Sequence, residues 1–158
     1  MSCDQAQPQI RKMQAADIPE IVTIAAGLRD APHWPHSAYL AALDPGSAPQ
    51  RIGMVAANNP AGDLVGFVVA SLIPPQAELE SIAVRSDEQR RGIGSKLFAR
   101  LVDELRAADV RELMLEVRAS NHTAIAFYEG HGWLQSGLRP RYYADPEDDA
   151  ILMSLSLG

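Results

Sequence analysis

The stretch Gln89-Arg90-Arg91-Gly92-Ile93-Gly94-Ser95 decides the fold of this 158-residue chain. It follows an apolar run, Leu79 to Val84, that predicts a strand. It opens an amphipathic helix whose apolar residues recur every four positions: Ile93, Leu97, Leu101 and Leu105. A glycine-containing turn at a helix start offers unpaired backbone N–H groups and the positive end of the helix dipole. Because Arg90 and Arg91 add full positive charges, the stretch predicts a phosphate or pyrophosphate site.

Three phosphate-binding patterns compete for this stretch. A P-loop needs Lys and then Ser or Thr directly after its second glycine, and Gly94-Ser95-Lys96 has the wrong order and spacing. A dinucleotide fingerprint needs Gly or Ala where Leu97 stands. The third pattern is Gln or Arg, two variable residues, Gly, one variable residue, then Gly or Ala. Gln89-x-x-Gly92-x-Gly94 matches it and resembles the pyrophosphate-binding turn of the GNAT superfamily of N-acetyltransferases. An ordinary helix start with two solvated arginines is the alternative.

Composition indicates a single globular domain over residues 1–158, with residues 1–8 as a flexible tail. Hydrophobic residues make up 47% and charged residues 22%, as in ordinary soluble proteins. The net charge of −6 argues against a general nucleic-acid binder. Because the chain lacks a signal-like N-terminus and any apolar run of the ~20 residues that would span a bilayer, we expect a cytoplasmic protein with no membrane partner. Cys3 is the single cysteine, which excludes an internal disulfide.

Hydrophobic periodicity and turn residues predict the order β-α-α-β-β-β-α-β-α-β-β, a mixed α/β layer fold. Asp17 and Ser37 are candidate caps for the first two helices, the second of which runs to Leu43. The last two strands are expected to flank a loop over residues 139–149. The predicted strands are 10–13, 51–57, 64–72, 77–84, 112–117, 133–138 and 150–157, and the later helices are 92–108 and 121–129.

That order is similar to the order of elements in GNAT proteins, and four further segments narrow the resemblance. They are 115–121, 124–129, 139–143 and 149–153, and they resemble the bacterial ribosomal-protein alanine N-acetyltransferases. The resemblance is strong from Leu79 to Met153 and weaker in the first half, where 31–37 only loosely resembles that group's Pro-Trp-Ser loop. It implies a GNAT fold, α/β (α+β), with one mixed sheet of six to seven strands and about four helices. It also implies acetyl-CoA as co-substrate, no metal, and a protein N-terminus as acceptor, such as that of a ribosomal protein.

Acetyl transfer to an amine needs a group that removes a proton from the amine and a group that stabilises the departing thiolate. An α-amine has a pKa of ~7.7–8.0, whereas a lysine amine at ~10.4 costs ~3–4 kcal/mol more to deprotonate near pH 7. The resemblance makes Glu116 the base; its alternative role is that of a solvent-facing strand carboxylate. Glu78 and Glu80, predicted to share a strand face, are rivals, although the similar enzymes lack a carboxylate matching Glu80.

The resemblance assigns Tyr128 as general acid for the thiolate and Asn121 as a ligand of the pantetheine arm. The two residues lie seven positions apart, which places them on one helix face. Their alternatives are a packed aromatic and a plain helix cap. The backbone of Ile82, Ala83 and Val84 would pair with pantetheine amides like a neighbouring strand, although a core strand would have the same sequence. The residues expected to hold the pyrophosphate are Arg90, Arg91, Gly92, Ile93, Gly94 and Ser95.

Trp34, Tyr142 and Tyr143 are candidate walls of the acceptor groove, with core packing as the alternative. His33 and His36 have no companion Cys or acidic cluster, so we expect no metal site. The leading functional hypothesis is therefore an acetyl-CoA-dependent N-acetyltransferase acting on a protein N-terminal amine. A second keeps acetyl-CoA but takes a small amine or a lysine side chain. A third, from another class, is a non-catalytic acyl-CoA-binding regulatory module.

Overall fold

The computed structural model describes residues 8–28, 33–58, 63–89 and 92–158. Within them, seven strands form one mixed sheet in the order β1-β2-β3-β4-β5-β7-β6, in which β4 and β5 run parallel. The predicted order of elements and the predicted mixed sheet are confirmed. The elements are β1 (Gln9–Lys12), α1 (Ile18–Ala26), α2 (His36–Leu43), β2 (Gln50–Ala57), β3 (Leu64–Ile73), β4 (Gln76–Val84), α3 (Ile93–Ala107), β5 (Glu112–Arg118), α4 (His122–Gly130), β6 (Leu134–Ala144) and β7 (Glu147–Ser156).

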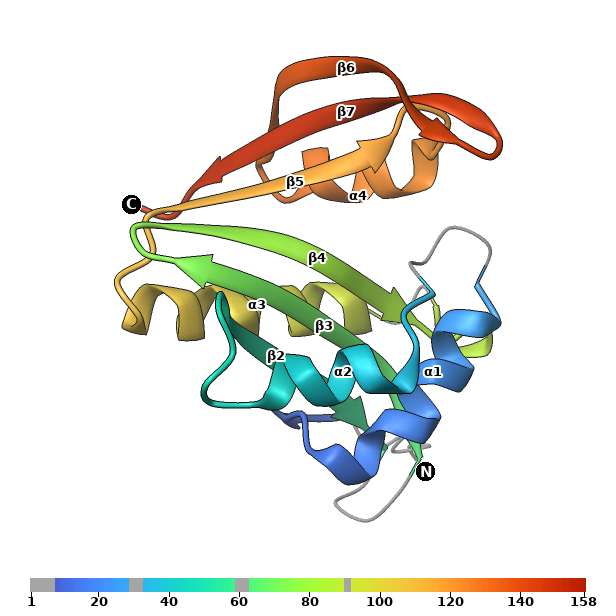
Figure 1. The fold of residues 1–158 in the computed structure, drawn as a ribbon, viewed down its shortest axis with the longest axis vertical. Coiled ribbons are helices and arrows are strands. Elements are labelled where there is room, and N and C mark those ends of the chain that lie inside the picture. The colour runs from blue at the N-terminus through green and yellow to red at the C-terminus, as the bar shows by residue number, and fades with distance from the viewer. Residues whose placement is uncertain (1–7, 29–32, 59–62, 90–91) are drawn as a thin grey trace, which may run out of the picture.

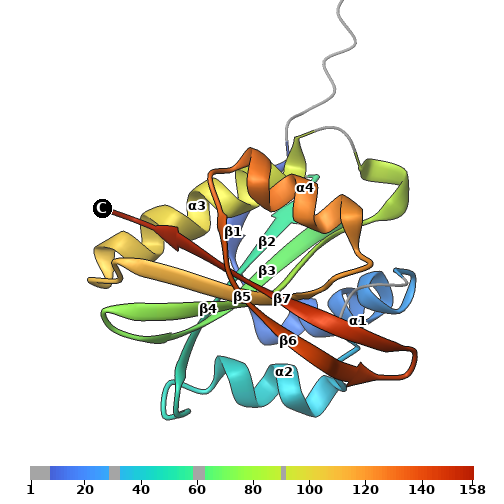
Figure 2. The ribbon, with the colours of Figure 1, turned by 90° about the horizontal axis from the view of Figure 1, so that it is seen from above.

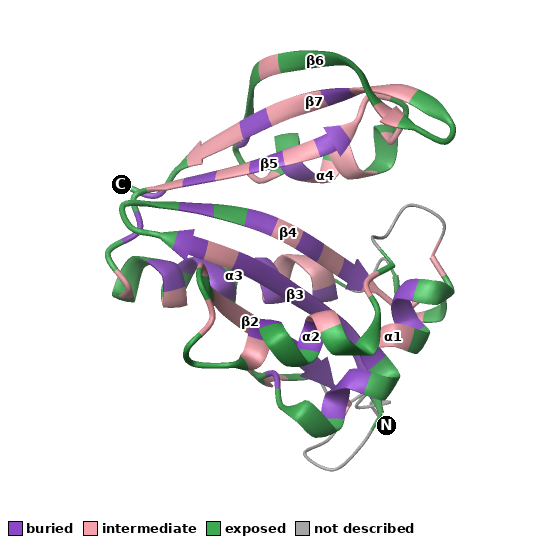
Figure 3. Ribbon diagram, viewed as in Figure 1, coloured by how far each residue is buried: buried purple, intermediate pink, exposed green. Residues whose placement is uncertain are grey.

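Helices cover both faces of the sheet. Figure 2 shows α3 and α4 on one face and α1 and α2 on the other. The larger core lies under α3, which buries its apolar stripe at Ile93, Leu97, Leu101 and Leu105. The smaller core joins α1 and α2 to β2 and β3 around Tyr39 and Phe67. Figure 3 shows the resulting buried stripes on β2 to β4, whereas β6, an edge strand, is mostly exposed.

The predicted loop over residues 139–149 is wrong, because β6 and β7 extend through most of it and leave only Asp145-Pro146 as the turn. The acidic run and two prolines are typical of a loop, but here they lie within the β6–β7 hairpin. Arg141 has a φ of 55° at a break in the β6–β7 register, and its N–H donates to Asp149 Oδ1 at 2.9 Å. Pro140 lies in that irregular segment, where a missing N–H is tolerated.

Of the two predicted caps, Asp17 holds the N-cap position of α1, whereas Ser37 is not the cap of α2. Helix α2 begins at His36 after Pro35, so Ser37 lies inside it. Asp17 precedes α1, but its carboxylate makes no cap bond there. It instead accepts two hydrogen bonds from Arg11, both of 2.8 Å, and one from the Gln14 N–H. The predicted tail lies outside the described residues except for Pro8.

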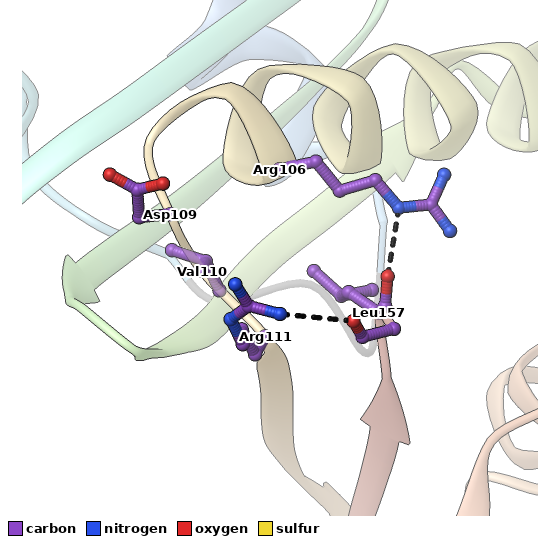
Figure 4. Close-up of a pocket in the computed structure, with 6 residues that line it drawn as sticks. Arg106, Asp109, Val110, Arg111 and Leu157 are labelled. Atoms are coloured by element: carbon purple, nitrogen blue, oxygen red, sulfur yellow. Dashed lines mark hydrogen bonds between the residues drawn. The ribbon is translucent and has the colours of Figure 1, made fainter.

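A shallow hollow lies at the C-terminal end of α3 (Figure 4). Arg106 Nε donates to Leu157 O at 3.0 Å, and Arg111 Nη1 donates to Gly158 O at 3.3 Å. These bonds fasten the two residues after β7 to α3 and to the residue before β5. The hollow is therefore at the opposite end of α3 from the predicted phosphate turn, and it belongs to the packing of the C-terminal residues.

Candidate active site

The sheet divides between β4 and β5. The two strands pair only through Gln76 with Glu112, Ala77 with Leu113 and Glu78 with Met114. Beyond these pairs they diverge, as Figure 1 shows, although β4 continues to Val84 and β5 to Arg118. The second half of β4 therefore has β3 on one side and no strand on the other within the described residues.

The open edge of β4 displays alternate backbone groups. Arg85 N–H donates to Val65 O on β3 at 2.8 Å, so the groups of Ala83 also face β3, and those of Ile82 and Val84 face the open side. Val84 O accepts a hydrogen bond from Gln89 Nε2 at 3.1 Å on that side. An extended amide-containing ligand can add to such an edge as another strand would.

A bulge in β4 turns Glu80 out of the regular strand alternation. Val69 pairs with Ser81 and Ala70 with Leu79, so Glu80 is the extra residue. Glu78 and Glu80 nevertheless lie on the same face of the sheet, as predicted, because Glu78 pairs with Ser71, the neighbour of Arg51, and Glu80 bonds Arg51 itself. Arg51 of β2 donates to Glu80 Oε1 from Nε at 2.7 Å and to Oε2 from Nη2 at 3.4 Å. Because the Glu80 side chain is only 14% exposed, the guanidinium is its main source of compensation.

Glu116 lies on β5 across the opening from Glu80. Its side chain is 27% exposed, and Oε1 is 3.6 Å from Arg139 Nη1 of β6. The Tyr142 hydroxyl donates to this carboxylate, which raises the pKa of Tyr142. Glu78 shares the Glu116 face of the sheet, because Glu78 pairs with Met114, two residues before Glu116. Loss of hydration, then repulsion from Glu116 and Glu80, raises the pKa of Glu78. An acidic patch thus lines the point where β4 and β5 part.

Tyr128 lies on α4, within the core below the opening. Its ring centroid is 5.6 Å from that of Phe127 and 5.5 Å from that of Trp133. Only 9% of the residue is exposed, and burial raises the pKa of its phenol to about 12. Tyr128 is therefore a neutral hydrogen-bond donor at any physiological pH. The ring of Tyr128 therefore fits the packed-aromatic alternative. Its hydroxyl is still available to donate a hydrogen bond.

Helix α3 begins beside the far end of the β4 edge. Gly92, with a φ of 77°, precedes the helix in a conformation that L side chains rarely adopt. The first α-helical bond is donated by Lys96 N–H to Gly92 O at 3.1 Å, so the amides of Ile93, Gly94 and Ser95 precede that ladder. A Cβ on Gly94 would lie 3.3 Å from the Phe127 ring. The glycine thus lets α3 approach α4. Arg90 and Arg91 lie outside the described residues.

Asn121 caps α4, since its Oδ1 accepts from Ala124 N–H at 3.2 Å. The cap alternative is confirmed. The amide nitrogen of this side chain is not used by the cap, so the predicted pantetheine contact stays open.

The three predicted acceptor residues divide between the two sides of the opening. Trp34 packs on Tyr39, with ring centroids 5.2 Å apart, and lies 5.9 Å from the Arg51 guanidinium. Tyr142 and Tyr143 are in edge contact at 5.1 Å on β6. Burial, and then the Glu116 charge, raises the pKa of Tyr143. The structure therefore places Trp34 near Arg51, the partner of Glu80, and both tyrosines near Glu116.

Three partners of these residues have no local signal in the sequence. Arg51 meets Glu80 only because the β2–β3–β4 register and the β4 bulge bring them together. Arg139 fell in the predicted loop. His131 bonds Phe127 O through Nδ1 at 2.7 Å and also contacts Ser95 Oγ through Nε2 at 2.9 Å.

Among the described residues, no group of three or more His, Cys, Asp or Glu side chains is placed to hold a metal ion. His33 Nε2 instead contacts Leu28 O at 3.0 Å. No helix in the described ranges is long and apolar enough to cross a membrane.

Comparison with known families decides the relationship. The profile of the Acetyltransferase (GNAT) family matches residues 18–133, which include the β4 edge, the glycine turn and Tyr128. The chain belongs to the GNAT family. The diverging strands and the acidic patch therefore belong to a GNAT sheet. N-acetyl transfer is the activity of the chain.

Named relatives narrow the class of this GNAT protein. It is 42% identical over 99 residues to the ribosomal protein bS18-alanine N-acetyltransferase of Escherichia coli (strain K12), covering 61% of this chain and 67% of that protein. The enzyme of the same name from Haemophilus ducreyi is 32% identical over 98 residues, covering 60% of this chain and 68% of the relative. The crystal structure of the Escherichia coli ribosomal-protein-S18-alanine N-acetyltransferase superposes with a TM-score of 0.81 at 30% identity, covering 96% of this chain and 94% of that one.

Proposed function

We propose that this chain transfers the acetyl group of acetyl-CoA to the α-amine of a protein N-terminus. The observation that carries the proposal is the divergence of β4 from β5. It leaves a strand edge that runs to the start of α3, with Glu116 beside it and Tyr128 beneath it. The similarity to bS18-alanine N-acetyltransferases supports a protein N-terminus, and a ribosomal protein in particular, as the acceptor.

The residues present suit acetyl-CoA as the acetyl donor. Ile82 offers its backbone N–H and C=O groups, and Val84 its N–H, to the pantetheine amides, and the Asn121 amide nitrogen can add a hydrogen bond. Backbone N–H groups from Ile93 to Ser95 and the α3 dipole suit the pyrophosphate. Arg90 and Arg91, although outside the described residues, add charge in the sequence next to them. When bound, acetyl-CoA supplies an acyl group activated as a thioester.

Glu116 removes the proton from the incoming ammonium group, directly or through one water molecule. A general base of this kind contributes ~10²- to 10⁴-fold to a rate. Glu80 is less suited to the role, because Arg51 already holds both of its oxygens. Glu78 adds negative charge next to Glu116, which attracts a cationic amine and favours its delivery to the base.

Tyr128 stabilises the departing sulfur by donating a hydrogen bond. Its pKa of about 12 exceeds that of an ordinary thiol at ~8.5, so complete proton transfer to the thiolate is uphill by ~5 kcal/mol. A short charge-assisted hydrogen bond from the neutral phenol avoids that cost and still lowers the barrier to C–S cleavage.

The acceptor segment lies between Trp34 on one side and Tyr142 with Tyr143 on the other. The exposed Tyr142 hydroxyl is held next to Glu116, which places an aromatic wall beside the base. An α-amine, with a pKa of ~7.7–8.0, needs ~3–4 kcal/mol less than a lysine amine to reach the reactive neutral form near pH 7.

The test is a rate comparison on matched peptides. Each pair shares one sequence that begins with alanine and contains one lysine. One peptide has a free α-amine and the other is blocked at the N-terminus. Polyamines serve as small-amine acceptors. We expect turnover only with the free α-amine. Equal rates on the blocked peptide would reject the α-amine assignment, and binding of acetyl-CoA without turnover on any acceptor would favour the regulatory module. The cytoplasmic location and the absence of nucleic-acid and membrane partners stay predictions.

A further inference from the structure

A hydrogen-bond chain runs from the end of α4 to the start of α3. His131 Nδ1 is 2.7 Å from Phe127 O, and His131 Nε2 is 2.9 Å from Ser95 Oγ. The imidazole is half-buried between two aromatic rings, with centroids 4.3 Å from Phe127 and 5.5 Å from Phe98. The chain therefore ends at a hydroxyl in the first turn of α3, within the proposed pyrophosphate site.

The proton positions in this hydrogen-bond chain follow from the groups at its two ends. A carbonyl oxygen only accepts, so Nδ1 must carry a proton to bond Phe127 O. In a neutral ring Nε2 then has a lone pair, and Ser95 must donate its O–H to it. The Ser95 hydroxyl proton thus points toward His131, and only oxygen lone pairs are left for an anion. This arrangement repels a phosphate oxygen.

We propose that His131 is a positioning residue for the acyl carrier's pyrophosphate, acting through Ser95 by taking up one proton when the carrier binds. The proton comes from solvent and adds to Nε2. The new Nε2–H donates to Ser95 Oγ, and the Ser95 O–H turns to donate to a phosphate oxygen. No other bond is formed or broken. The inference rests on the proposed function, because it assumes that acetyl-CoA binds at the start of α3.

The bound carrier favours the protonated ring. The bound pyrophosphate adds negative charge one side chain away. The groups that contact the ring are Ser95 and Phe98 of α3 and Phe127 of α4, and no ion pair reaches the ring from the described residues.

Isothermal titration calorimetry of the full chain with acetyl-CoA tests the proposal, because it reads proton uptake independently of turnover. Titrations at pH 7.5 in HEPES and in Tris, which differ in ionisation enthalpy, give the number of protons taken up per site. Since terminal phosphates titrate near ~6, dephospho-coenzyme A serves as a second probe that lacks the terminal phosphate. We expect uptake above zero and at most one proton, and affinity that falls by up to tenfold between pH 7.5 and 8.5.

Variants separate positioning from packing. Ser95→Ala should abolish the uptake and weaken binding about ten- to hundredfold, because a hydrogen bond to a charged group is lost. His131→Gln can donate to Ser95 permanently, so it should retain affinity but lose both the uptake and the pH dependence. His122→Gln removes an exposed histidine at the other end of α4 and should behave as wild type.

The outcomes distinguish the two proposals. If acetyl-CoA binds to the wild type with no more proton uptake than to Ser95→Ala, the role of His131 is overturned and the proposed function stands. If His131→Gln keeps the wild-type uptake, the proton goes elsewhere and the inference is again overturned. If acetyl-CoA does not bind the wild type at all, both proposals fail.

Discussion

The Arg51–Glu80 pair should be worth more than an ordinary surface ion pair. The two side chains are 24% and 14% exposed, and the guanidinium reaches both carboxylate oxygens, at 2.7 and 3.4 Å. Replacing Arg51 with Met leaves a largely buried carboxylate without its partner, at a cost below the 3–5 kcal/mol of a fully buried pair. We therefore expect Arg51→Met to lower the free energy of unfolding by about 2–3 kcal/mol.

A double-mutant cycle isolates the pair. Glu80→Gln keeps the shape of the side chain without its charge, so the double variant Arg51→Met/Glu80→Gln should be more stable than Arg51→Met alone. Urea unfolding at pH 7 of the wild type and the three variants should give a coupling of about 1–2 kcal/mol. A coupling within the ~0.3–0.5 kcal/mol seen for independent sites would show that the contact contributes nothing.

The same variants decide the role of Glu80 in the reaction. If Arg51 holds Glu80 as a structural carboxylate, Glu80→Gln should retain kcat within a few-fold on the free-amine peptide. A loss of ~10²-fold or more would instead make Glu80 the base.

Three further outcomes are expected. Glu116→Gln should lower kcat by ~10²- to 10⁴-fold at pH 7, and the loss should shrink above pH 8, where the α-amine is already neutral; an unchanged rate refutes the base assignment. Because the pKa of Tyr128 is about 12 against 10 in the unfolded chain, its contribution of about 3 kcal/mol to the free energy of unfolding is fully present below pH 10 and is lost between pH 10 and 12. Between pH 9 and pH 11.5, the free energy of unfolding should fall less in Tyr128→Phe than in the wild type. An equal fall in both proteins would contradict the prediction. Gly66→Ala should destabilise by ~1–3 kcal/mol, since its Cβ would lie 2.8 Å from Ala83 O, whereas Gly130→Ala meets nothing within 4 Å; equal melting temperatures would exclude the clash.

The elements that the sequence predicted well are those whose signal is local. The apolar stripe of α3, and the alternation and turn residues around β2, β3 and β4, depend on near neighbours in the chain. Both strands of the β6–β7 hairpin were predicted, but their extension through residues 139–149 was missed because Pro140 and the acidic run at 145–149 are typical of loops. Its strands are held instead by pairing between the two strands and by the Asp149 carboxylate on Arg141 N–H. Such compensation across a hairpin leaves no trace in local composition.

The candidate site shows the same limit. Glu116, Tyr128 and the glycine turn could be named because a family pattern carries them. The partners that set their environment, Arg51 and Arg139, come from distant strands. Whether Glu80 stands free or paired depends on one extra residue in β4, and the register of three strands determines that bulge. Single-sequence periodicity does not resolve such a one-residue shift.

The late position of β7 in the chain has a consequence for how the molecule assembles. Every residue of β5 pairs with β7, whereas only Glu112 to Met114 also pair with β4. During synthesis, the strand that carries Glu116 therefore gains most of its backbone partners only after β7 has emerged. Strands β1 to β4 can pair before that point. Pulsed hydrogen exchange during refolding should protect β5 amides after those of β3; simultaneous protection would contradict this order.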